Sequence, residues 1–374
     1  MLRLKEEAPV TTELEPIELP ILPDEPLVSV LVSNYNYARF VGDALESALR
    51  QTYERIEIVV CDDGSTDDSC SVIEKIADKD SRLTLIRKSN GGQASAFNAS
   101  FREASGEIIC FLDSDDLWST SKVESIVDSF RTSNQGLALH KMVIVDASMR
   151  ELQQIPTFTR QENGWIANKV LARGGRWRWM PSSAIAMRRE ILDRILPMPE
   201  ARFRSDADTF ILMLAPLMTE IKNLPLVLGS YRLHGSNAFA GKDMDARAAT
   251  RTLEALTIGI EEVNRRLVEM GFEHVKIDSR KNIKIAEQEF LRDAFEGRSR
   301  RSLAKQYIAL AAKLREDDLY SGAQKAWACL MFGLIIPLPL RYRLRWASLN
   351  LGTSRLREFV RRIQQRELRS GGQE

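Results

Sequence analysis

The sequence predicts an α/β protein followed by a mostly helical C-terminal region, and three observations carry this prediction. Short apolar runs of strand length alternate with segments of helical spacing between residues 27 and 145. This alternation is typical of a parallel sheet with helices on both faces. From about Asp243 onward, nearly every segment has helical periodicity. Apolar residues make up 44% and charged residues 28% of the 374-residue chain, which are ordinary values for a globular protein.

Five strands and four helices are expected in order along the first part of the chain. The strands are VSVLV (28–32), IEIVVC (56–61), LTLI (83–86), EIICFL (107–112) and LALHKMVIV (137–145). The helices cover residues 40–49, about 66–77, about 93–104 and about 119–130. The first helix illustrates the argument, because its apolar residues at positions 40, 41, 44, 45, 48 and 49 fall on one face.

Composition divides the chain into three expected parts. Residues 1–26 hold five of the 13 prolines and many glutamates, which is typical of an extended leader. Residues 27–240 contain the alternating strands and helices, and residues 241–374 form the helical region. The basic N-terminal residues are not followed by the apolar segment of a signal peptide. The longest uncharged run, residues 326–340, contains two prolines and is too short for a confident membrane span.

Charge and cysteine content limit the partners of the chain. A net charge of +1 provides no global field that would attract nucleic acid. The four cysteines show no CxxC spacing, so we expect reduced thiols in a cytoplasmic protein. Residues 341–374 contain nine arginines and three glutamates and follow the apolar run. This order favours either a helix at the inner face of a membrane or a buried helix with a basic, solvated end.

Polar clusters follow four of the predicted strands. They are SNYNY (33–37), DDGSTD (62–67), SNGGQ (89–93) and DSDD (113–116). Because the carboxyl ends of parallel strands meet at one edge of a sheet, the four clusters predict a single polar pocket. Neither G-x-G-x-x-G nor a Walker loop follows the first strand, which argues against a glycine-rich phosphate loop. Clustered aspartates instead favour a divalent metal that holds a nucleotide diphosphate.

Five motifs in this order, VSVLVSNYN, DDGSTD, NGGQASAFN, ASGEIICFLDSDD and YRLHGSN, resemble the family-2 glycosyltransferases of the GT-A fold. The resemblance covers residues 27 to 237. It implies a nucleotide-binding mixed sheet flanked by helices. It also implies inverting transfer of a sugar from a UDP-, GDP- or dTDP-sugar to a saccharide or glycoconjugate hydroxyl, as in polysaccharide synthesis. The implied cofactor is Mn²⁺ or Mg²⁺.

The resemblance places the nucleobase and ribose of the donor at the ends of the first two strands. The corresponding residues are Ser33, Tyr35 and Asp63, with Asp62 beside them. For the two aspartates, the alternative is that they only form hydrogen bonds within the turn before the next glycine. The loop that ends at Gly92 is expected to approach the donor closely.

The D-x-D motif of the family falls on Asp113 and Asp115. The resemblance implies that Asp113 lies near the ribose and that Asp115 binds the metal, with His234 as a further ligand. A lone histidine is otherwise more often structural. Asp116 is expected to face solvent or to cap the following helix, with the ring of Trp118 packed behind it.

The catalytic base of the family falls on Asp206 in RSDADTFILMLA (204–215), where Ser205 replaces the usual glutamate. This base would remove the proton of the acceptor hydroxyl. The alternative is that the side chain of Ser205 or Asp206 caps the following helix. Asp208 is assigned to the acceptor side.

The acceptor side also includes residues 177–190 by resemblance. There, Trp177 and Trp179 form either a platform on which a sugar stacks or part of the hydrophobic core. Two other functions stay open at this point. The replacement by Ser205 would suit a catalytically inactive nucleotide-sugar-binding protein. A sugar nucleotidyltransferase would carry a basic, glycine-rich loop after its first strand, which SNYNYARF (33–40) lacks.

Overall fold

The computed structural model describes residues 14–154, 162–234, 246–343 and 346, and it divides into two compact units. The sheet unit comprises the described residues of Met1–Val170, Arg178–Arg232 and Glu262–Lys276. The helical unit comprises those of Leu171–Trp177, Leu233–Glu261 and Ile277–Glu374. The units interleave along the chain, and a division into domains at residue 240 stays a prediction.

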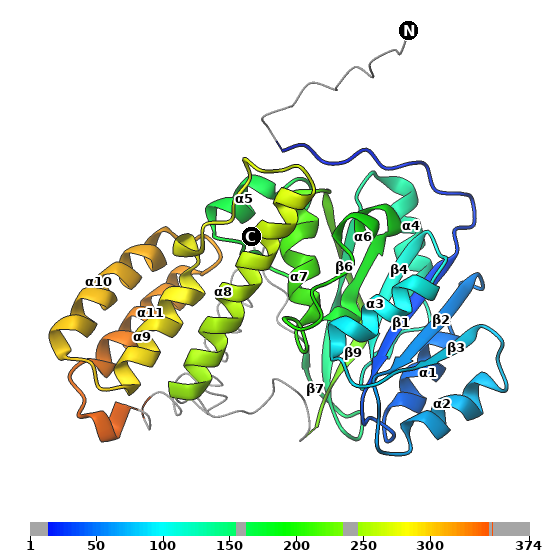
Figure 1. Ribbon diagram of the computed structural model, residues 1–374, viewed down its shortest axis with the longest axis horizontal. Coiled ribbons are helices and arrows are strands. Elements are labelled where there is room, and N and C mark those ends of the chain that lie inside the picture. The colour runs from blue at the N-terminus through cyan, green and yellow to red at the C-terminus, as the bar shows by residue number, and fades with distance from the viewer. Residues whose placement is uncertain (1–13, 155–161, 235–245, 344–345, 347–374) are drawn as a thin grey trace, which may run out of the picture. The chain divides into compact units, whose positions relative to one another are not determined.

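Nine strands of the described residues form one mixed sheet, in the order β3-β2-β1-β4-β8-β6-β9-β5, with β7 paired to β6 (Figure 1). The first four strands of this order run parallel, as expected. β8 is antiparallel to both β4 and β6, so the sheet is mixed, as the resemblance implied. The strands are β1 (Val28–Asn34), β2 (Ile56–Asp62), β3 (Leu83–Arg87), β4 (Ile108–Asp113), β5 (Leu117–Trp118), β6 (Leu137–Asp146), β7 (Glu151–Gln154), β8 (Ile185–Arg188) and β9 (Ile221–Leu233).

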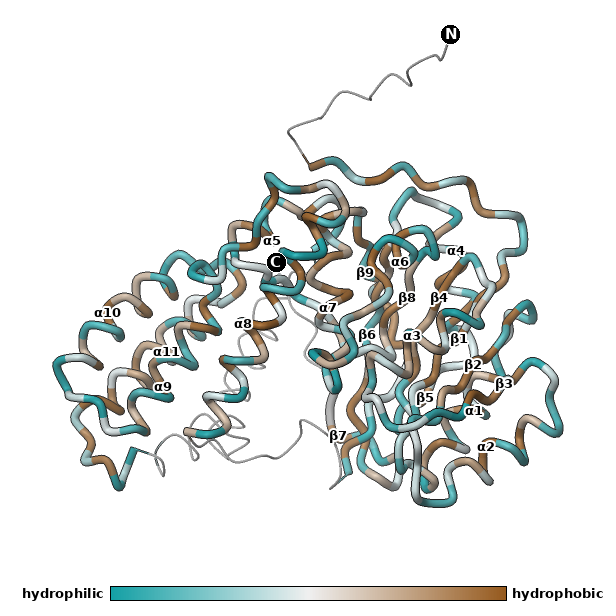
Figure 2. Tube along the Cα trace, in the orientation of Figure 1, coloured by the Kyte–Doolittle hydropathy of each residue, from teal (hydrophilic) through white to brown (hydrophobic). Residues whose placement is uncertain are grey.

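Helices cover both faces of the parallel part of the sheet. On one face, β1, β2 and β4 pack with α1 and α4 around residues such as Val30, Leu45 and Ile126. On the other face, Cys61 of β2 packs with Ala96 and Ala99 of α3. Figure 2 colours these central strands mostly brown, because both faces are buried and alternation with polar residues is lost. The helices before residue 220 are α1 (Val41–Leu49), α2 (Ser69–Ala77), α3 (Gln93–Glu103), α4 (Lys122–Thr132), α5 (Ala167–Ala172), α6 (Arg189–Ile195) and α7 (Ala207–Leu214).

The described part of the leader, residues 14–26, contains no helix or strand, as expected. Backbone and side-chain hydrogen bonds tie it to the sheet unit. The Ile17 amide donates to the Met218 carbonyl at 2.7 Å, and the Tyr53 hydroxyl donates to the Pro26 carbonyl at 2.6 Å. The leader is therefore an extended strap on this unit, at least over its described residues.

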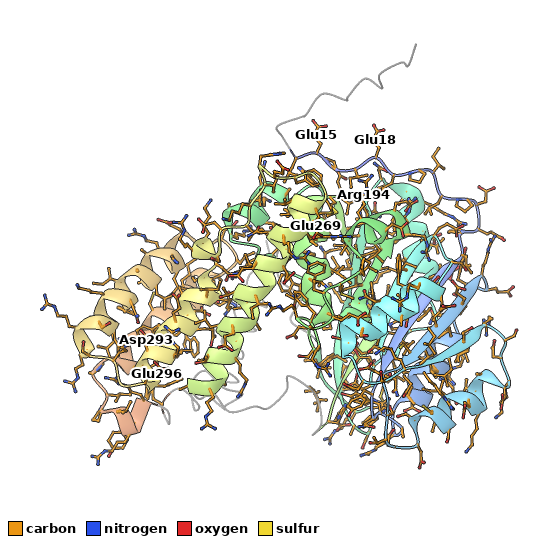
Figure 3. All side chains as sticks on the ribbon, viewed as in Figure 1. Glu15, Glu18, Arg194, Glu269, Asp293 and Glu296 are labelled. Carbon is orange, nitrogen blue, oxygen red and sulfur yellow. The ribbon has the colours of Figure 1, made fainter. Side chains whose placement is uncertain are left out.

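The helical unit has a core of its own. Phe290 and Phe332 meet edge to face with ring centroids 5.5 Å apart, and Leu303 and Leu310 are buried beside them. Asp293, labelled in Figure 3, accepts a hydrogen bond from Gln306 at 2.7 Å, which joins α9 to α10. In the described parts of the chain, no helix is long and apolar enough to cross a membrane. The helices after residue 240 are α8 (Ala246–Glu269), α9 (Ile283–Phe295), α10 (Arg300–Glu316) and α11 (Gly322–Ile335).

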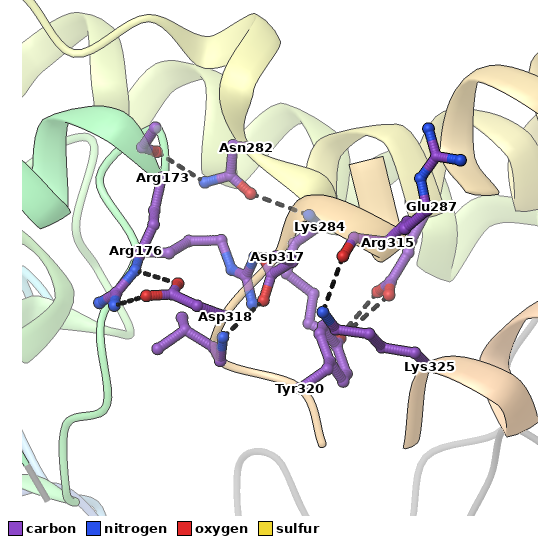
Figure 4. A network of polar contacts seen from close by, with 12 residues as sticks. Arg173, Arg176, Asn282, Lys284, Glu287, Arg315, Asp317, Asp318, Tyr320 and Lys325 are labelled. Atoms are coloured by element: carbon purple, nitrogen blue, oxygen red, sulfur yellow. Dashed lines mark hydrogen bonds and ion pairs between the residues drawn. The ribbon is translucent and has the colours of Figure 1, made fainter. Parts of the chain in front are cut away.

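A short segment, residues 171–177, is held within the helical unit by charged side chains (Figure 4). Arg173 donates to Asp318 at 2.7 Å, and Arg176 pairs with Asp317 at 2.5 Å. Gly174 between them has a φ of +63°, and a Cβ there would lie 2.5 Å from the backbone nitrogen of Asn282. These contacts hold residues 171–177 in place within the helical unit, just before the chain enters the stretch that leads to β8.

Candidate active site

The ends of β1, β2 and β4 lie side by side, as the polar clusters predicted. Ser33 of β1 is paired with Asp113 of β4, and Asn34 is paired with Asp62 of β2. The loop after β3 joins the same edge, because Lys88 donates to Asp63 at 2.6 Å. Four segments that are separated in sequence therefore form one polar edge of the sheet.

Asp62 serves the turn after β2. Its carboxylate accepts hydrogen bonds from the side chain of Asn34 at 2.7 Å and from the amide of Ser65 at 2.8 Å. Burial opposes ionisation, but the hydrogen bonds from Ser65, Asn34 and Cys70 outweigh it and hold the pKa of Asp62 below its usual value. These contacts favour the turn role, and a contact of Asp62 with the donor stays a prediction.

Asp63 holds the loop that follows β3. One carboxylate oxygen accepts from Lys88 and from the Gly91 amide at 2.9 Å, and the other accepts from the Gly92 amide at 2.7 Å. The residue is 2% exposed. Both oxygens are therefore engaged by the loop in this structure, and a contact with the nucleobase stays a prediction.

Three tyrosines lie at or near this edge. The side chain of Tyr35 is 46% exposed, which leaves its ring available for stacking on a base. Tyr37 and Tyr231 were not singled out from the sequence. Burial and the negative charges of the DSDD carboxylates raise the pKa of both hydroxyls, so both phenols stay protonated hydrogen-bond donors beside the acidic cluster.

Asp113 is supported by two consecutive serines. Its carboxylate accepts a hydrogen bond from the hydroxyl of Ser182, and its amide donates to the hydroxyl of Ser183 at 3.0 Å. Burial raises the pKa of Asp113 to about 7, and the negative charge of Asp115 adds to the shift. Both serines lie in the segment 177–190 that the resemblance assigned to the acceptor side, but neither was singled out from the sequence.

The expectation that Asp116 faces solvent or caps a helix is wrong. It is 1% exposed, and its carboxylate accepts a hydrogen bond from the Arg232 amide at 3.0 Å. The reason is that β5 follows it directly and pairs with β9, so α4 begins only at Lys122. Burial, followed by the charges of Asp115 and Asp113, raises the pKa of Asp116 well above its usual value.

Beneath this cluster lies a fully buried lysine that the sequence analysis missed. The ammonium group of Lys122 donates to the Ser183 carbonyl at 3.0 Å and sits 3.2 Å from the ring centroid of Trp118. The Trp118 indole donates to the same carbonyl at 2.9 Å. Burial lowers the pKa of Lys122 to about 7. The Trp118 ring is buried, as expected.

The acidic cluster suits a divalent cation. Burial and the neighbouring negative charges raise the pKa of Asp113 and of Asp116, and a cation beside them would favour the ionised forms. Carboxylate oxygens are also the ligands that Mn²⁺ and Mg²⁺ accept. In the part of the chain that the structure describes, no group of three or more His, Cys, Asp or Glu side chains is arranged to hold a metal ion by itself. His234 follows β9 and belongs to the helical unit, so its role as a ligand stays a prediction.

Asp206 stands at the start of α7 but does not cap it with its side chain. Its backbone is left-handed, with a φ of +78°, and its carboxylate makes no capping hydrogen bond. Instead, the side-chain oxygen of Gln93 accepts from the amides of Asp206 and Ala207, at 3.1 and 3.0 Å. Ser205 is exposed and precedes the cap position. The capping alternative is therefore wrong for both residues.

Burial raises the pKa of Asp206 to about 6. The half-buried Asp208, two residues on, has its pKa raised to about 6 by burial and then by the charge of Asp206. A carboxyl group that titrates near neutrality is suited to accept a proton from a hydroxyl group.

The two tryptophans assigned to the acceptor side differ in their surroundings. Trp177 is 5% exposed and belongs to the helical unit, which favours the core alternative for this residue. Trp179 is half-buried and belongs to the sheet unit, and its contact with an acceptor sugar stays a prediction.

Comparison with known proteins agrees with this geometry. Residues 29–196 match the model of glycosyl transferase family 2. A relative from Nostoc sp. (strain PCC 7120), named an uncharacterized glycosyltransferase, is 34% identical over 82% of this chain and 93% of its own length. The Escherichia coli UDP-Glc:alpha-D-GlcNAc-diphosphoundecaprenol beta-1,3-glucosyltransferase WfaP is 44% identical over 28% of this chain and 42% of its own length.

The fold also has solved counterparts. The crystal structure of S. aureus TarS residues 1–349 in complex with UDP-GlcNAc has a TM-score of 0.53 and 18% identity. The match covers 86% of this chain and 90% of that one. With a relative of 34% identity along nearly its whole length, the chain belongs to glycosyl transferase family 2 and is a glycosyltransferase.

Proposed function

We propose that this chain is a metal-dependent, inverting glycosyltransferase that moves a sugar from a nucleotide-diphosphate sugar to a hydroxyl group of a saccharide or glycoconjugate. One observation carries the proposal. The side chain of Gln93 contacts the amide of Asp206 at 3.1 Å and lies 3.5 Å from the carboxylate of Asp113. One side chain thus joins the backbone of the residue proposed as base to an acidic cluster suited to a metal-bound diphosphate.

The donor is proposed to be a UDP-, GDP- or dTDP-sugar. The name of WfaP specifies UDP-glucose, and this relative shares 44% identity over 107 residues, which supports a UDP-sugar. We assign the exposed ring of Tyr35 to stacking on the base, and Ser33 and Asp113 to the ribose side. Gly92 lets the backbone approach the donor closely because it has no side chain.

Asp115 is the proposed ligand of Mn²⁺ or Mg²⁺, and it would share the cation with the diphosphate oxygens of the donor. When bound, the cation supplies positive charge that stabilises the departing nucleoside diphosphate. Asp206 takes the proton of the acceptor hydroxyl as that oxygen attacks the anomeric carbon, on the face opposite the diphosphate. Attack from the opposite face inverts the configuration, and the proton stays on the Asp206 carboxylate until solvent removes it.

A panel of nucleotide sugars tests this function. UDP-glucose, UDP-GlcNAc, GDP-mannose and dTDP-glucose are each added with and without Mn²⁺, and the melting temperature and released nucleotide are measured. A donor at about 100 times its Kd should stabilise the protein by about 2.7 kcal/mol. Stabilisation with release of nucleoside diphosphate supports the proposal. Stabilisation without release would indicate a binding protein. Consumption of added pyrophosphate, with formation of the nucleoside triphosphate and a sugar 1-phosphate, would indicate a nucleotidyltransferase.

We further propose a cytoplasmic location with peripheral contact at the inner face of a membrane, through the basic helices. In α11, Met331 and Ile335 are buried, whereas Leu330 is 55% and Leu334 38% exposed. Exposed apolar and basic side chains together are typical of interfacial helices. The arginine-rich segment from residue 347 onward lies outside the described residues. Flotation with vesicles that contain anionic lipid should recover the protein, and vesicles of neutral lipid should not.

A further inference from the structure

Gln93 occupies a position that links the two halves of the candidate active site. It is the first residue of α3 and follows Gly92, whose φ is +92°. Its backbone amide donates to the Arg204 carbonyl at 2.8 Å, and the Ala94 amide donates to the Phe203 carbonyl at 3.2 Å. The start of α3 is therefore joined to the loop that leads into α7.

The contact between these two loops is close enough to fix their spacing. A Cβ on Gly92 would lie 2.5 Å from the Cα and 2.7 Å from the carbonyl oxygen of Arg204. Across the same contact, the Arg204 guanidinium donates a hydrogen bond to the side-chain oxygen of Asn90 at 2.5 Å. From the other side, Asp63 holds the amides of Gly91 and Gly92. Hydrogen bonds thus connect Asp63, directly after β2, with the loop that leads into α7.

The side chain of Gln93 completes this connection. A helix normally needs a side-chain acceptor at its N-terminus, and aspartate is among the preferred residues. If the Asp206 carboxylate capped α7, that carboxylate would be engaged with backbone amides. Those amides would be the second and third of the helix, Asp208 and Thr209. The carboxamide oxygen of Gln93 accepts from the two preceding amides, those of Asp206 and Ala207, and the Asp206 carboxylate makes no capping bond.

We propose that Gln93 is a positioning residue that holds the backbone of Asp206 at the start of α7, and thereby orients the Asp206 carboxylate toward the acceptor. The inference rests on the proposed role of Asp206 as base. The nitrogen of the same carboxamide points to Asp113 at 3.5 Å, so one side chain sets the distance between the donor-side carboxylate and the base. A left-handed aspartate costs free energy, and the two hydrogen bonds that the amides of Asp206 and Ala207 donate to Gln93 stabilise that backbone conformation.

The chain offers a matched control in Gln51. This glutamine is buried, whereas Gln93 is half-buried, and its carboxamide oxygen accepts from the Val123 amide at 2.9 Å, in the first turn of α4. It therefore supports a helix start from another element, as Gln93 does, but it has no contact with the proposed base. Gln51→Leu therefore measures how the loss of a glutamine contact at a helix start affects the protein when the proposed base is not touched.

The experiment compares Gln93→Leu, Gln93→Glu and Gln51→Leu with the wild type. Release of UDP from UDP-glucose and UDP-GlcNAc, and of GDP from GDP-mannose, gives kcat and KM. Amide hydrogen exchange of the peptide that contains residues 206 and 207 measures whether these two amides keep their hydrogen bonds to residue 93. For Gln93→Leu we expect faster exchange and a kcat lower by about tenfold to a hundredfold. The affinity for UDP with Mn²⁺ should stay within about threefold, because Ser182 and Ser183 still hold Asp113.

Gln93→Glu keeps an oxygen acceptor, so the amide protection should return and kcat should exceed that of Gln93→Leu. A kcat of Gln93→Leu within about twofold of the wild type would overturn the inference. An equal loss of kcat in Gln51→Leu would also overturn it. Asp206→Asn is measured in parallel to separate the two proposals. Normal turnover of Asp206→Asn refutes the base itself, whereas slow Asp206→Asn with normal Gln93→Leu refutes only the positioning role.

Discussion

Replacing Asp206 with asparagine should change activity and stability in opposite directions. Asparagine has nearly the same shape and tolerates the left-handed conformation at this position, where φ is +78°. It cannot take up the proton of an acceptor hydroxyl. A single general base contributes about 10²–10⁴-fold in rate, so turnover should fall by that factor. Donor binding should be retained, because the variant leaves the acidic cluster at the end of β4 unchanged.

The expected gain in stability follows from the pKa of the carboxyl group. Burial raises the pKa of Asp206 from 3.8 to about 6. At about 1.36 kcal/mol per unit, ionising this group in the folded protein costs about 3 kcal/mol at most. Asparagine carries no charge and avoids that cost. The variant also removes the negative charge that raises the pKa of Asp208, which acts in the same direction.

The sign of the pH dependence is fixed by the direction of the shift. Because the folded-state pKa of Asp206 is above the unfolded one, the folded protein binds more protons between pH 3.8 and about 6. The stability of the wild type relative to the variant therefore falls as the pH rises through this window. The variant and the wild type should be equally stable below about pH 4, and the full difference should be present at pH 7.

Urea unfolding at pH 4, 5.5 and 7, together with nucleotide release, checks both effects. Asp80→Asn is the control of opposite sign, because a hydrogen bond from Arg82 holds the pKa of Asp80 below its usual value. That variant should lose stability at pH 7 and keep full turnover. A stability difference for Asp206→Asn that does not change with pH would contradict the buried carboxyl group. Full turnover of Asp206→Asn would refute its role as base.

Four further predictions concern other residues. Gly92→Ala should lower stability by about 2–4 kcal/mol and reduce turnover, because its Cβ would meet the backbone of the neighbouring loop at 2.5 Å. At Gly164, where φ is +76°, an added Cβ would have no atom within 4 Å. Gly164→Ala should therefore lower the free energy of unfolding, measured in urea, by only about 1–2 kcal/mol of backbone strain. Asp115→Asn should abolish the Mn²⁺-dependent part of UDP binding in calorimetry, and an unchanged titration would exclude Asp115 as a ligand. Arg176→Glu should cost about 3–5 kcal/mol because it breaks a buried ion pair, and adding Asp317→Arg should recover part of this loss in a double-mutant cycle.

Most elements of the sheet unit could be predicted from the sequence. The strands β1, β2 and β4 are mostly apolar runs, and α1 and α4 have apolar residues at helical spacing. These patterns depend on neighbours within about ten residues, so they can be read without the fold. The same holds for the polar strand ends, since the order of parallel strands sends them to one edge.

The sequence by itself determined the family motifs and hence the expected position of the carboxylates. Only the tertiary structure decided what each carboxylate contacts. Asp116 is buried because β5 returns to β9, and its partner Arg232 is 116 residues away. The backbone of Asp206 is held by the side-chain oxygen of Gln93, 113 residues earlier in the chain. Local periodicity is set by adjacent residues, whereas hydrogen-bond partners and burial are set by segments that meet only when the chain folds.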